Sequence, residues 1–330
     1  MNETSRHADV ILPTNRILTK SHCDMSLYRL ATRNVANWSP AVLALNESID
    51  ERQEWETLLR LAALGEGLGT DVDVVALDDA KARKLCELAW GQQRDAGTDV
   101  PHTNKKSVED WYQAVSVRRG PDRLLDISLR SGPYGVPSEL LPDGLSLEVL
   151  EGNPHGVDLG PLQPRVPEVL RTPSGRIELA PELLIADVER LRSRLVDVSA
   201  DATSLLLVGR RHVRSNNSWM HNVRVLVKGK NRCTLHVHPD DATRVSVRDG
   251  ELAVLESSVG SIVVRVEVTD AVMRGVVSLP HGWGQHDEGV VLDVARSVES
   301  ANTNAVIPAR VDVPSGNAIL TGVRVTLRRS

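Results

Sequence analysis

The sequence lacks several features that particular functions require. Its 330 residues contain no Phe and only three cysteines, and no apolar run approaches the roughly 20 residues of a membrane-spanning helix. The first residues, MNETSRHADV, are polar and lack the basic-then-apolar order of a signal peptide. The formal net charge is −5 with no large basic block, which argues against a nucleic-acid partner. These absences predict a cytoplasmic protein that binds neither a membrane nor nucleic acid.

The three cysteines, Cys23, Cys86 and Cys233, are widely separated and form no C-x-x-C pair. A zinc ribbon or an iron–sulfur cluster needs several thiolates at one centre, usually from close spacings. We therefore expect no iron–sulfur cluster within this chain. Apolar residues make up 41% and charged residues 25%, which is typical of a folded core, and the length is enough for two domains.

Common catalytic and nucleotide-binding motifs receive little support. The glycine-rich run at 65–69 follows a predicted helix, whereas a dinucleotide fingerprint follows a strand, so we interpret it as a helix end and a loop. There is no P-loop and no G-x-S-x-G elbow. His236 and His238 share one face of a predicted strand, and His281 and His286 could complete a metal site. The alternative is ordinary polar residues, and we predict no catalytic residue and no metal ligand.

The region before residue 130 alternates between strand-like and helix-like patterns. The predicted elements are strands at 9–13 and 73–77 and helices at 46–65 and 79–90, with Ser48 or Asp50 as the N-cap of the first helix. Such alternation is typical of an α/β layer, and the small number of strands indicates part of a sheet. Residues 131–171 are rich in turn sequences and are predicted to connect this region to the next.

The remainder of the chain is dominated by strand patterns. A helix is expected over 181–195, followed by short Val-rich strands at 205–208, 234–237, 252–257, 261–268, 276–279 and 323–327. Asp249-Gly250 and Val259-Gly260 supply tight turns between them. Six short strands within about 130 residues are typical of a compact barrel.

A polar segment follows the first of these strands. Residues 209–219 contain three arginines, one histidine, two serines and two asparagines. Guanidinium groups suit phosphate oxygens, and Asn and Ser suit the edges of a base or a pterin. Composition alone leaves two interpretations open, a ligand-binding loop and a solvated loop.

Several stretches then match the ordered motifs of one family. They are 2–13 (NETSRHADVILP), 172–178 (TPSGRIE), Val208-Gly209-Arg210, 238–242 (HPDDA), Asp249-Gly250, 279–282 (LPHG) and Asn304 with Asp312 and Ser315-Gly316. Together they resemble the C-terminal half of the molybdopterin oxidoreductases of the dimethyl sulfoxide reductase superfamily, which includes formate dehydrogenases and nitrate reductases. The resemblance covers nearly the whole chain.

The resemblance implies an α/β remnant of a doubly wound domain at 1–130, a connecting region at 131–171 and an all-β double-psi β-barrel at 172–330. In the family, the loop after the Gly-Arg strand holds a molybdopterin guanine dinucleotide. The cofactor-binding residues implied here are Gly209, Arg210, Arg211, His212, Ser215, Asn216, Asn217, Asn304 and Lys20. Arg296 occupies another contacting position but differs in residue type.

The sequence also departs from the family pattern, and these departures bear on whether the chain is expected to be catalytic alone. The family's iron–sulfur cysteines and molybdenum ligand lie upstream of the motif that 2–13 resembles, and Thr19 stands where many relatives carry Glu. The resemblance therefore implies a truncated or split formate-dehydrogenase-like oxidoreductase, not catalytic alone, with a separate N-terminal catalytic half as its partner. The alternatives are a non-enzymatic double-psi barrel used for binding or assembly, and the product of a decayed reading frame.

Overall fold

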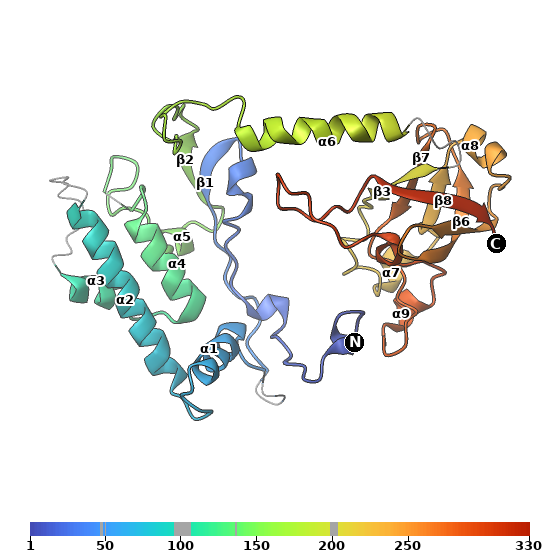
Figure 1. Ribbon diagram of the computed structural model, residues 1–330. Helices are drawn as coiled ribbons and strands as arrows, with labels where there is room; N and C mark the ends of the chain where they lie inside the picture. Colours follow the sequence, from blue (N-terminus) through green and yellow to red (C-terminus); the bar gives the residue numbers. More distant parts are fainter. Residues whose placement is uncertain (47–48, 50, 96–106, 136, 199–203) are drawn as a thin grey trace. The chain divides into compact units, whose positions relative to one another are not determined.

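The computed structural model describes residues 1–46, 49, 51–95, 107–135, 137–198 and 204–330 (Figure 1). Its contacts divide the chain into two units. Met1–Ile11 and Leu170–Ser330 form one, here called the barrel unit, and Leu12–Val169 form the other, here called the helical unit. Within the described ranges, no helix is long and apolar enough to cross a membrane.

The helical unit is built from short helices and one small sheet. Its helices are α1 (Glu54–Gly65), α2 (Val74–Asp95), α3 (Val108–Val115), α4 (Gly120–Ser131) and α5 (Leu147–Glu151), with 3-10 turns at Ile17–Thr19 and Leu27–Leu30 (Figure 1). Strands β1 (Arg33–Ala36) and β2 (Val157–Pro161) pair antiparallel. One apolar core lies between α2, α3 and α4 around the fully buried Trp111, and a second surrounds Leu147 and Leu150 of α5. The segment 131–171, expected as a connection, therefore contributes both α5 and β2.

Two predicted strands of this region are wrong. Residues 73–77 lead into α2, whose buried positions Val74, Asp78, Ala82, Cys86 and Ala89 recur every three or four residues, as in a helix. Residues 9–13 form no strand, and Val10 is 75% exposed. The predicted helix at 79–90 lies within α2, but the one at 46–65 begins only at Glu54. Its expected caps, Ser48 and Asp50, fall outside the described residues.

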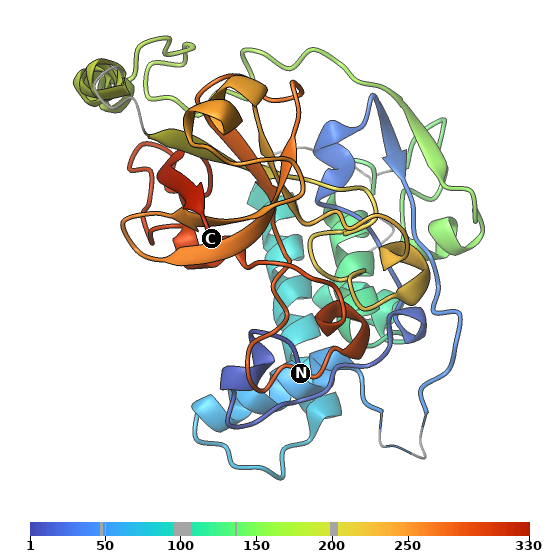
Figure 2. The same ribbon diagram turned by 90° about the vertical axis from the view of Figure 1, so that its right-hand side faces the viewer.

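The six predicted strands of the barrel unit are confirmed, with ends shifted by two residues at most. They are β3 (Leu205–Arg210), β4 (Thr234–Val237), β5 (Leu252–Glu256), β6 (Ser261–Val268), β7 (Val276–Pro280) and β8 (Val323–Arg329). They close into a barrel (Figure 2), and their order around it is β3-β7-β4-β6-β5-β8. The helices of this unit are α6 (Glu182–Val198), α7 (Arg224–Val227), α8 (Pro239–Arg244) and α9 (Asp293–Arg296), with 3-10 turns at Ser5–His7 and Thr303–Val306.

The barrel pairs its strands as two equivalent halves. Strand β3 is parallel to β7 and antiparallel to β8, just as β6 is parallel to β4 and antiparallel to β5. The remaining pairs, β4 with β7 and β5 with β8, each join one half to the other. This symmetric pairing is that of a double-psi barrel. The predicted fold class, an α/β region followed by such a barrel, is confirmed.

Alternate residues along each strand fill the barrel interior, because successive side chains in a strand point to opposite faces. Leu205, Leu207, Leu235 and Leu255 are all completely or almost completely buried, and β8 alternates buried and exposed positions. The side chains between them, such as those of Leu206 and His236, lie on the outer face and are half-buried. The rigid core thereby fixes where β3 and β7 end, and the candidate site begins at those ends.

Candidate functional site

Two polar loops leave the barrel at the same edge. Strands β3 and β7 are parallel neighbours, and the last residue of one, Arg210, pairs with the last residue of the other, Pro280. Residues 211–223, the β3 loop, and residues 281–292, the β7 loop, therefore start side by side. Parallel pairing alone brings two segments that are distant in sequence to one place.

The two loops meet through three side chains. Arg211 donates a hydrogen bond from Nη1 to Oδ1 of Asn217, and the same nitrogen lies 3.0 Å from Nε2 of His281. His281 Nε2 is also 3.1 Å from Asn217 Oδ1. A neutral imidazole nitrogen can accept from Arg211 or donate to Asn217, but not both. Arg211 and Asn217 are exposed, so this cluster presents a cation and polar donors to a ligand in solvent.

The backbone of the β3 loop adds further donors. Asn216 and Asn217 have φ angles of 41° and 61°, in the left-handed region that Asn tolerates better than most residues. In the described part of the chain, the N–H groups of Asn216, Asn217 and Ser218 have no hydrogen-bond acceptor. Consecutive free N–H groups in a turn of this kind form an anion-binding concavity. Asn217, in the middle of this run, is the residue whose side chain contacts Arg211.

A close contact fixes the second loop against the first. Gly282 has a φ of +82°, and a Cβ there would lie 2.6 Å from the carbonyl oxygen of Asn217. Next to Gly282 in the sequence, the ring of Trp283 stacks on that of His221 with centroids 3.7 Å apart. His221 Nδ1 is 2.9 Å from the Gly282 carbonyl oxygen, so Nδ1 carries the proton of the neutral ring. Burial lowers the pKa of His221, which favours this neutral form.

The other predicted residues of the β3 segment have different surroundings. Gly209 borders open space, and Ser215 is buried in the turn. Arg210 is turned toward the barrel, where Nη1 and Nη2 each donate to a backbone carbonyl at 2.8 Å. His212 accepts the N–H of Arg214 at Nδ1, and burial followed by repulsion from nearby arginines lowers its pKa. Within this segment, Arg211 is therefore the arginine whose exposed guanidinium faces the two-loop cluster.

Three predicted residues lie outside the two-loop contact. Asn304 is exposed on the Thr303–Val306 turn, and Arg296 on α9 donates to the carbonyl of Val290 at 2.8 Å. Lys20 belongs to the helical unit, where its ammonium lies 2.7 Å from Glu54. The neighbouring Thr19 is buried and accepts a hydrogen bond from Asn15.

The first residues of the chain pack on the barrel loops, which the sequence does not reveal. Arg6 pairs with Asp287 at 3.0 Å, and Glu3 accepts a hydrogen bond from Asn302 at 2.9 Å. The N–H of Val291 donates to the carbonyl of Met1. Burial and the nearby Asp287 raise the pKa of Glu3. The motif at the start of the chain thus covers the β7 loop.

The sequence suggests His281 only as a metal ligand, yet it lies beside Arg211. The available signal is its position directly after a predicted strand, within the 279–282 motif. The other three candidate histidines have separate partners. His236 lies 3.6 Å from Glu267, His238 accepts the N–H of Asp240, and His286 contacts Val298 and Ser300. Among the residues that the structure describes, no group of three or more His, Cys, Asp or Glu could hold a metal ion.

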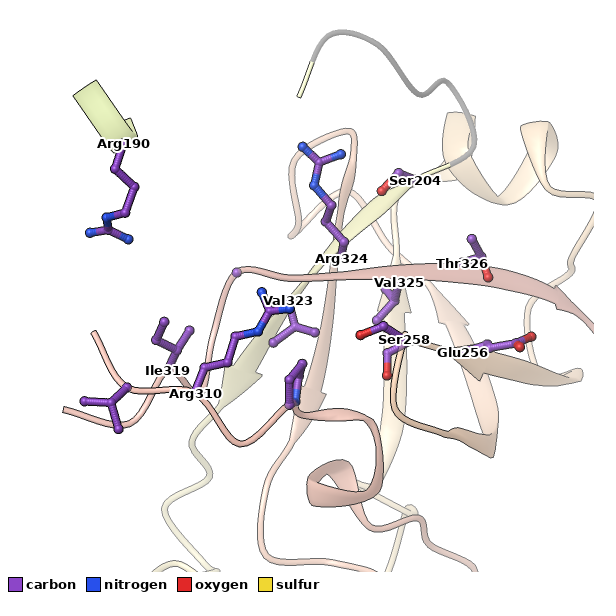
Figure 3. A pocket seen from close by; sticks show the side chains of 14 residues that line it. Arg190, Ser204, Glu256, Ser258, Arg310, Ile319, Val323, Arg324, Val325 and Thr326 are labelled. Atoms are coloured by element: carbon purple, nitrogen blue, oxygen red, sulfur yellow. The ribbon is translucent and has the colours of Figure 1, made fainter. Parts of the chain in front are cut away.

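The barrel unit also has a groove of about 890 Å³ that none of the predicted residues lines. It is bordered by β8, the β5–β6 turn and residues 308–323 (Figure 3). Three arginines line it, Arg190, Arg310 and Arg324, and Figure 3 shows their guanidinium groups apart from one another. The groove therefore offers no convergent set of donors comparable to that of the two loops.

Comparison with known proteins places the two loops within a recognised domain. Residues 205–323 match the family model of the molydopterin dinucleotide binding domain. The chain is 31% identical over 315 residues to a Halobacterium salinarum protein described as the catalytic chain of a dimethyl sulfoxide reductase, covering 94% of this chain and 32% of that protein. It is 25% identical over 298 residues to the dimethyl sulfoxide/trimethylamine N-oxide reductase of Rhodobacter capsulatus, covering 88% and 32%.

Among solved structures, acetylene hydratase from Pelobacter acetylenicus shares the fold. The TM-score is 0.55 at 16% identity, and the match covers 97% of this chain and 38% of that one. The chain therefore belongs to the dimethyl sulfoxide reductase superfamily of molybdopterin oxidoreductases and contains its dinucleotide-binding domain. The resemblance seen in the sequence is confirmed. The chain spans about a third of the length of the two reductases.

Proposed function

We propose that the β3 and β7 loops hold the nucleotide end of a molybdopterin guanine dinucleotide, within an oxidoreductase of the dimethyl sulfoxide reductase type. The observation that carries this proposal is the contact of the Arg211 guanidinium with the side chain of Asn217, whose backbone N–H is one of three consecutive free N–H groups at this barrel edge. Both features suit a pyrophosphate, because charged and backbone donors bind phosphate oxygens strongly. Both also lie within the matched domain.

Each residue has a distinct task in this proposal. Arg211 and the 216–218 N–H groups would bind phosphate oxygens, and the amides of Asn217 and Asn304 would bind polar edges of the guanine or pterin. His281 would orient Arg211 and Asn217. When bound, the molybdenum of such a cofactor supplies the redox chemistry. Because the chain spans a third of its relatives' length, we propose that the metal ligand and substrate pocket come from polypeptide outside these residues.

The names of the relatives favour one substrate class. Two are reductases of dimethyl sulfoxide or trimethylamine N-oxide, so we propose that the complete enzyme reduces an oxygen-containing acceptor. Four statements stay predictions from the sequence: formate-dehydrogenase-like chemistry, a split enzyme, a cytoplasmic location and the requirement for a separate catalytic partner.

Titration with nucleoside diphosphates tests the proposal. GDP contains the guanosine and pyrophosphate of the cofactor, and we expect the 330-residue chain to bind it more tightly than ADP or guanosine. Isothermal titration calorimetry measures all three. Equal affinity for GDP and ADP would contradict guanine recognition, and no binding of either would contradict the pyrophosphate site. Molybdenum and guanine nucleotide in protein purified from its native host would support the complete assignment.

A further inference from the structure

We infer that Arg210 is a positioning residue, which joins three barrel strands and thereby orders the β3 loop, and that it does not grip the phosphate itself. The inference rests on the proposed function only for its effect on ligand affinity. Its structural part concerns the chain without ligand. The evidence for the structural part is the pair of hydrogen bonds that Nη1 and Nη2 of Arg210 donate to backbone carbonyls.

Arg210 closes a gap between β4 and β7. These strands pair only at His236 with Ser278 and at Val237 with Val277, so the ladder stops before Thr234. Arg210 Nη1 donates to the Ser278 carbonyl and Nη2 to the Thr234 carbonyl, each at 2.8 Å. One side chain on β3 therefore bonds to both strands at the place where their ladder ends. The β7 loop begins three residues after Ser278, and the β3 loop begins immediately after Arg210.

A carboxylate on β6 completes this arrangement. Glu267 accepts the hydroxyl of Thr234 at 2.6 Å and pairs with Lys230 at 2.8 Å. Burial lowers the pKa of Arg210, and the negative charge of Glu267 opposes that effect. Arg210 thus has a nearby counter-charge as well as two backbone acceptors, so the guanidinium is satisfied where it lies.

A bidentate grip on phosphate uses two guanidinium nitrogens, at least one of which would be Nη1 or Nη2, and both of these already donate to the barrel backbone. Turning Arg210 toward a ligand would leave the carbonyls of Ser278 and Thr234 without this donor. Arg211, by contrast, is exposed, and its guanidinium contacts the side chains of Asn217 and His281 rather than the barrel backbone. The adjacent arginines therefore have different roles: Arg210 binds the barrel backbone, and Arg211 is left to bind the ligand.

Hydrogen exchange of the free protein tests the structural part. In Arg210→Met, we expect the amides of Met220, His221 and Val223, which bond within the β3 loop, to exchange about tenfold faster because the loop loses its anchor. The barrel amide of Val266, which donates to the carbonyl of Glu251, should keep its rate. Unchanged exchange in the loop would overturn the inference. If Arg210→Met fails to fold, Arg210→Lys, which keeps one donor, should show a smaller acceleration of the same amides.

Arg244→Met is the matched control. Arg244 is more exposed than Arg210 but also has a hydrogen-bond partner in the barrel unit, Asp241, at 2.8 Å. It lies on α8, directly after β4, and β4 is antiparallel to β7, so α8 is at the opposite edge of the barrel. Loss of this arginine should leave exchange in the β3 loop unchanged. Equal acceleration in both variants would mean a general loss of stability and would overturn the positioning role.

The salt dependence of GDP binding separates positioning from direct contact. A charge that touches phosphate is screened by salt, so its removal should reduce the salt dependence. We expect Arg210→Met to bind GDP about tenfold more weakly with the salt dependence of the wild type, whereas Arg211→Met should lose part of that dependence. A reduced dependence in Arg210→Met would overturn the inference. Absence of GDP binding by the wild type would refute the proposed function, while the exchange result would still decide the role of Arg210.

Discussion

At the scale of single residues, Arg211 should contribute most to nucleotide binding. A charge-assisted hydrogen bond contributes about 1.5–3 kcal/mol, so Arg211→Ala should weaken GDP binding by roughly ten- to a hundredfold. Arg211→Lys should recover only part of this, because an ammonium keeps the charge but lacks the planar fork. Asn304→Ala should cost about 0.5–1.5 kcal/mol, as for a neutral hydrogen bond. Calorimetric titration of the four proteins, with the exposed Arg328→Ala as control, measures these differences. Equal affinities across the series would place the site elsewhere.

The sequence predicts that the segment after β3 is polar, but not the direction of each arginine. Arg210 and Arg211 are neighbours with the same side chain. Arg210 turns to the barrel because its guanidinium donates to the carbonyls of Thr234 and Ser278, 24 and 68 residues away. These carbonyls lie near Arg210 only because of the register in which the strands pair, and that register is set when the whole barrel is assembled. The same reason explains why the sequence does not link His281 to Arg211.

His221 should make the contact between the loops sensitive to pH. Burial lowers its pKa below the ordinary value near 6.5, with smaller contributions from His281 and His212. The stability from the neutral ring should be fully present above that ordinary value and should be lost as the pH falls through the lowered one. His221→Phe keeps an aromatic ring against Trp283 but cannot titrate. Urea titrations between pH 7 and pH 4 measure how the unfolding free energy depends on pH. It should fall less steeply in the variant, because unfolding of the variant no longer takes up the proton that His221 binds. Parallel curves would exclude His221 as the titrating group.

At the scale of elements, the close approach of the two loops depends on Gly282. Gly282→Ala forces an ordinary side chain into the left-handed region, at about 1–2 kcal/mol, and overlap with the Asn217 carbonyl should add about 1–3 kcal/mol. Gly250→Ala is the control, because Gly250 has a similar φ of +77° with nothing within 4 Å of its Cβ position. Urea unfolding should show the larger loss for Gly282→Ala, together with weaker GDP binding. Equal losses would mean that the loop contact contributes nothing.

Strands of the barrel are predictable from sequence, and those of the helical unit are not. In the barrel, Val-rich alternation and tight turns coincide with strands buried on one face, so local pattern and tertiary position agree. Residues 73–77 are also apolar, but Val74 is the first of a series of buried positions that continues through α2. The helical period becomes clear only when the longer segment is considered. The apolar run at 9–13 is exposed, so hydrophobicity alone does not determine burial.

At the scale of the whole molecule, the two units should unfold as separate transitions. The apolar core of the barrel unit shares no residue with the two cores of the helical unit, and a domain with its own core can fold independently. Leu147→Ala in the helical unit and Leu235→Ala in the barrel unit each empty a fully buried position and should cost about 2–5 kcal/mol. Scanning calorimetry should show each variant lowering one transition by about 5 °C or more and leaving the other in place. A single transition lowered by both substitutions would mean that the units fold as one.

The separate transitions also locate the ligand. A ligand that binds only the folded barrel should raise the barrel transition alone, because its binding free energy is added to that unit's stability. At a GDP concentration about one hundred times the dissociation constant, the gain is about 2.7 kcal/mol. This gain corresponds to a rise of about 5–10 °C for a unit of this size. Arg211→Ala, with its ten- to hundredfold weaker binding, should reduce this gain to about 0.4–1.4 kcal/mol at the same GDP concentration. It should move neither transition in the absence of GDP, since Arg211 is exposed. The Leu235→Ala variant identifies which transition belongs to the barrel. A GDP-dependent rise of the other transition would place the nucleotide site in the helical unit, where Lys20 lies, and would contradict the assignment to the β3 and β7 loops.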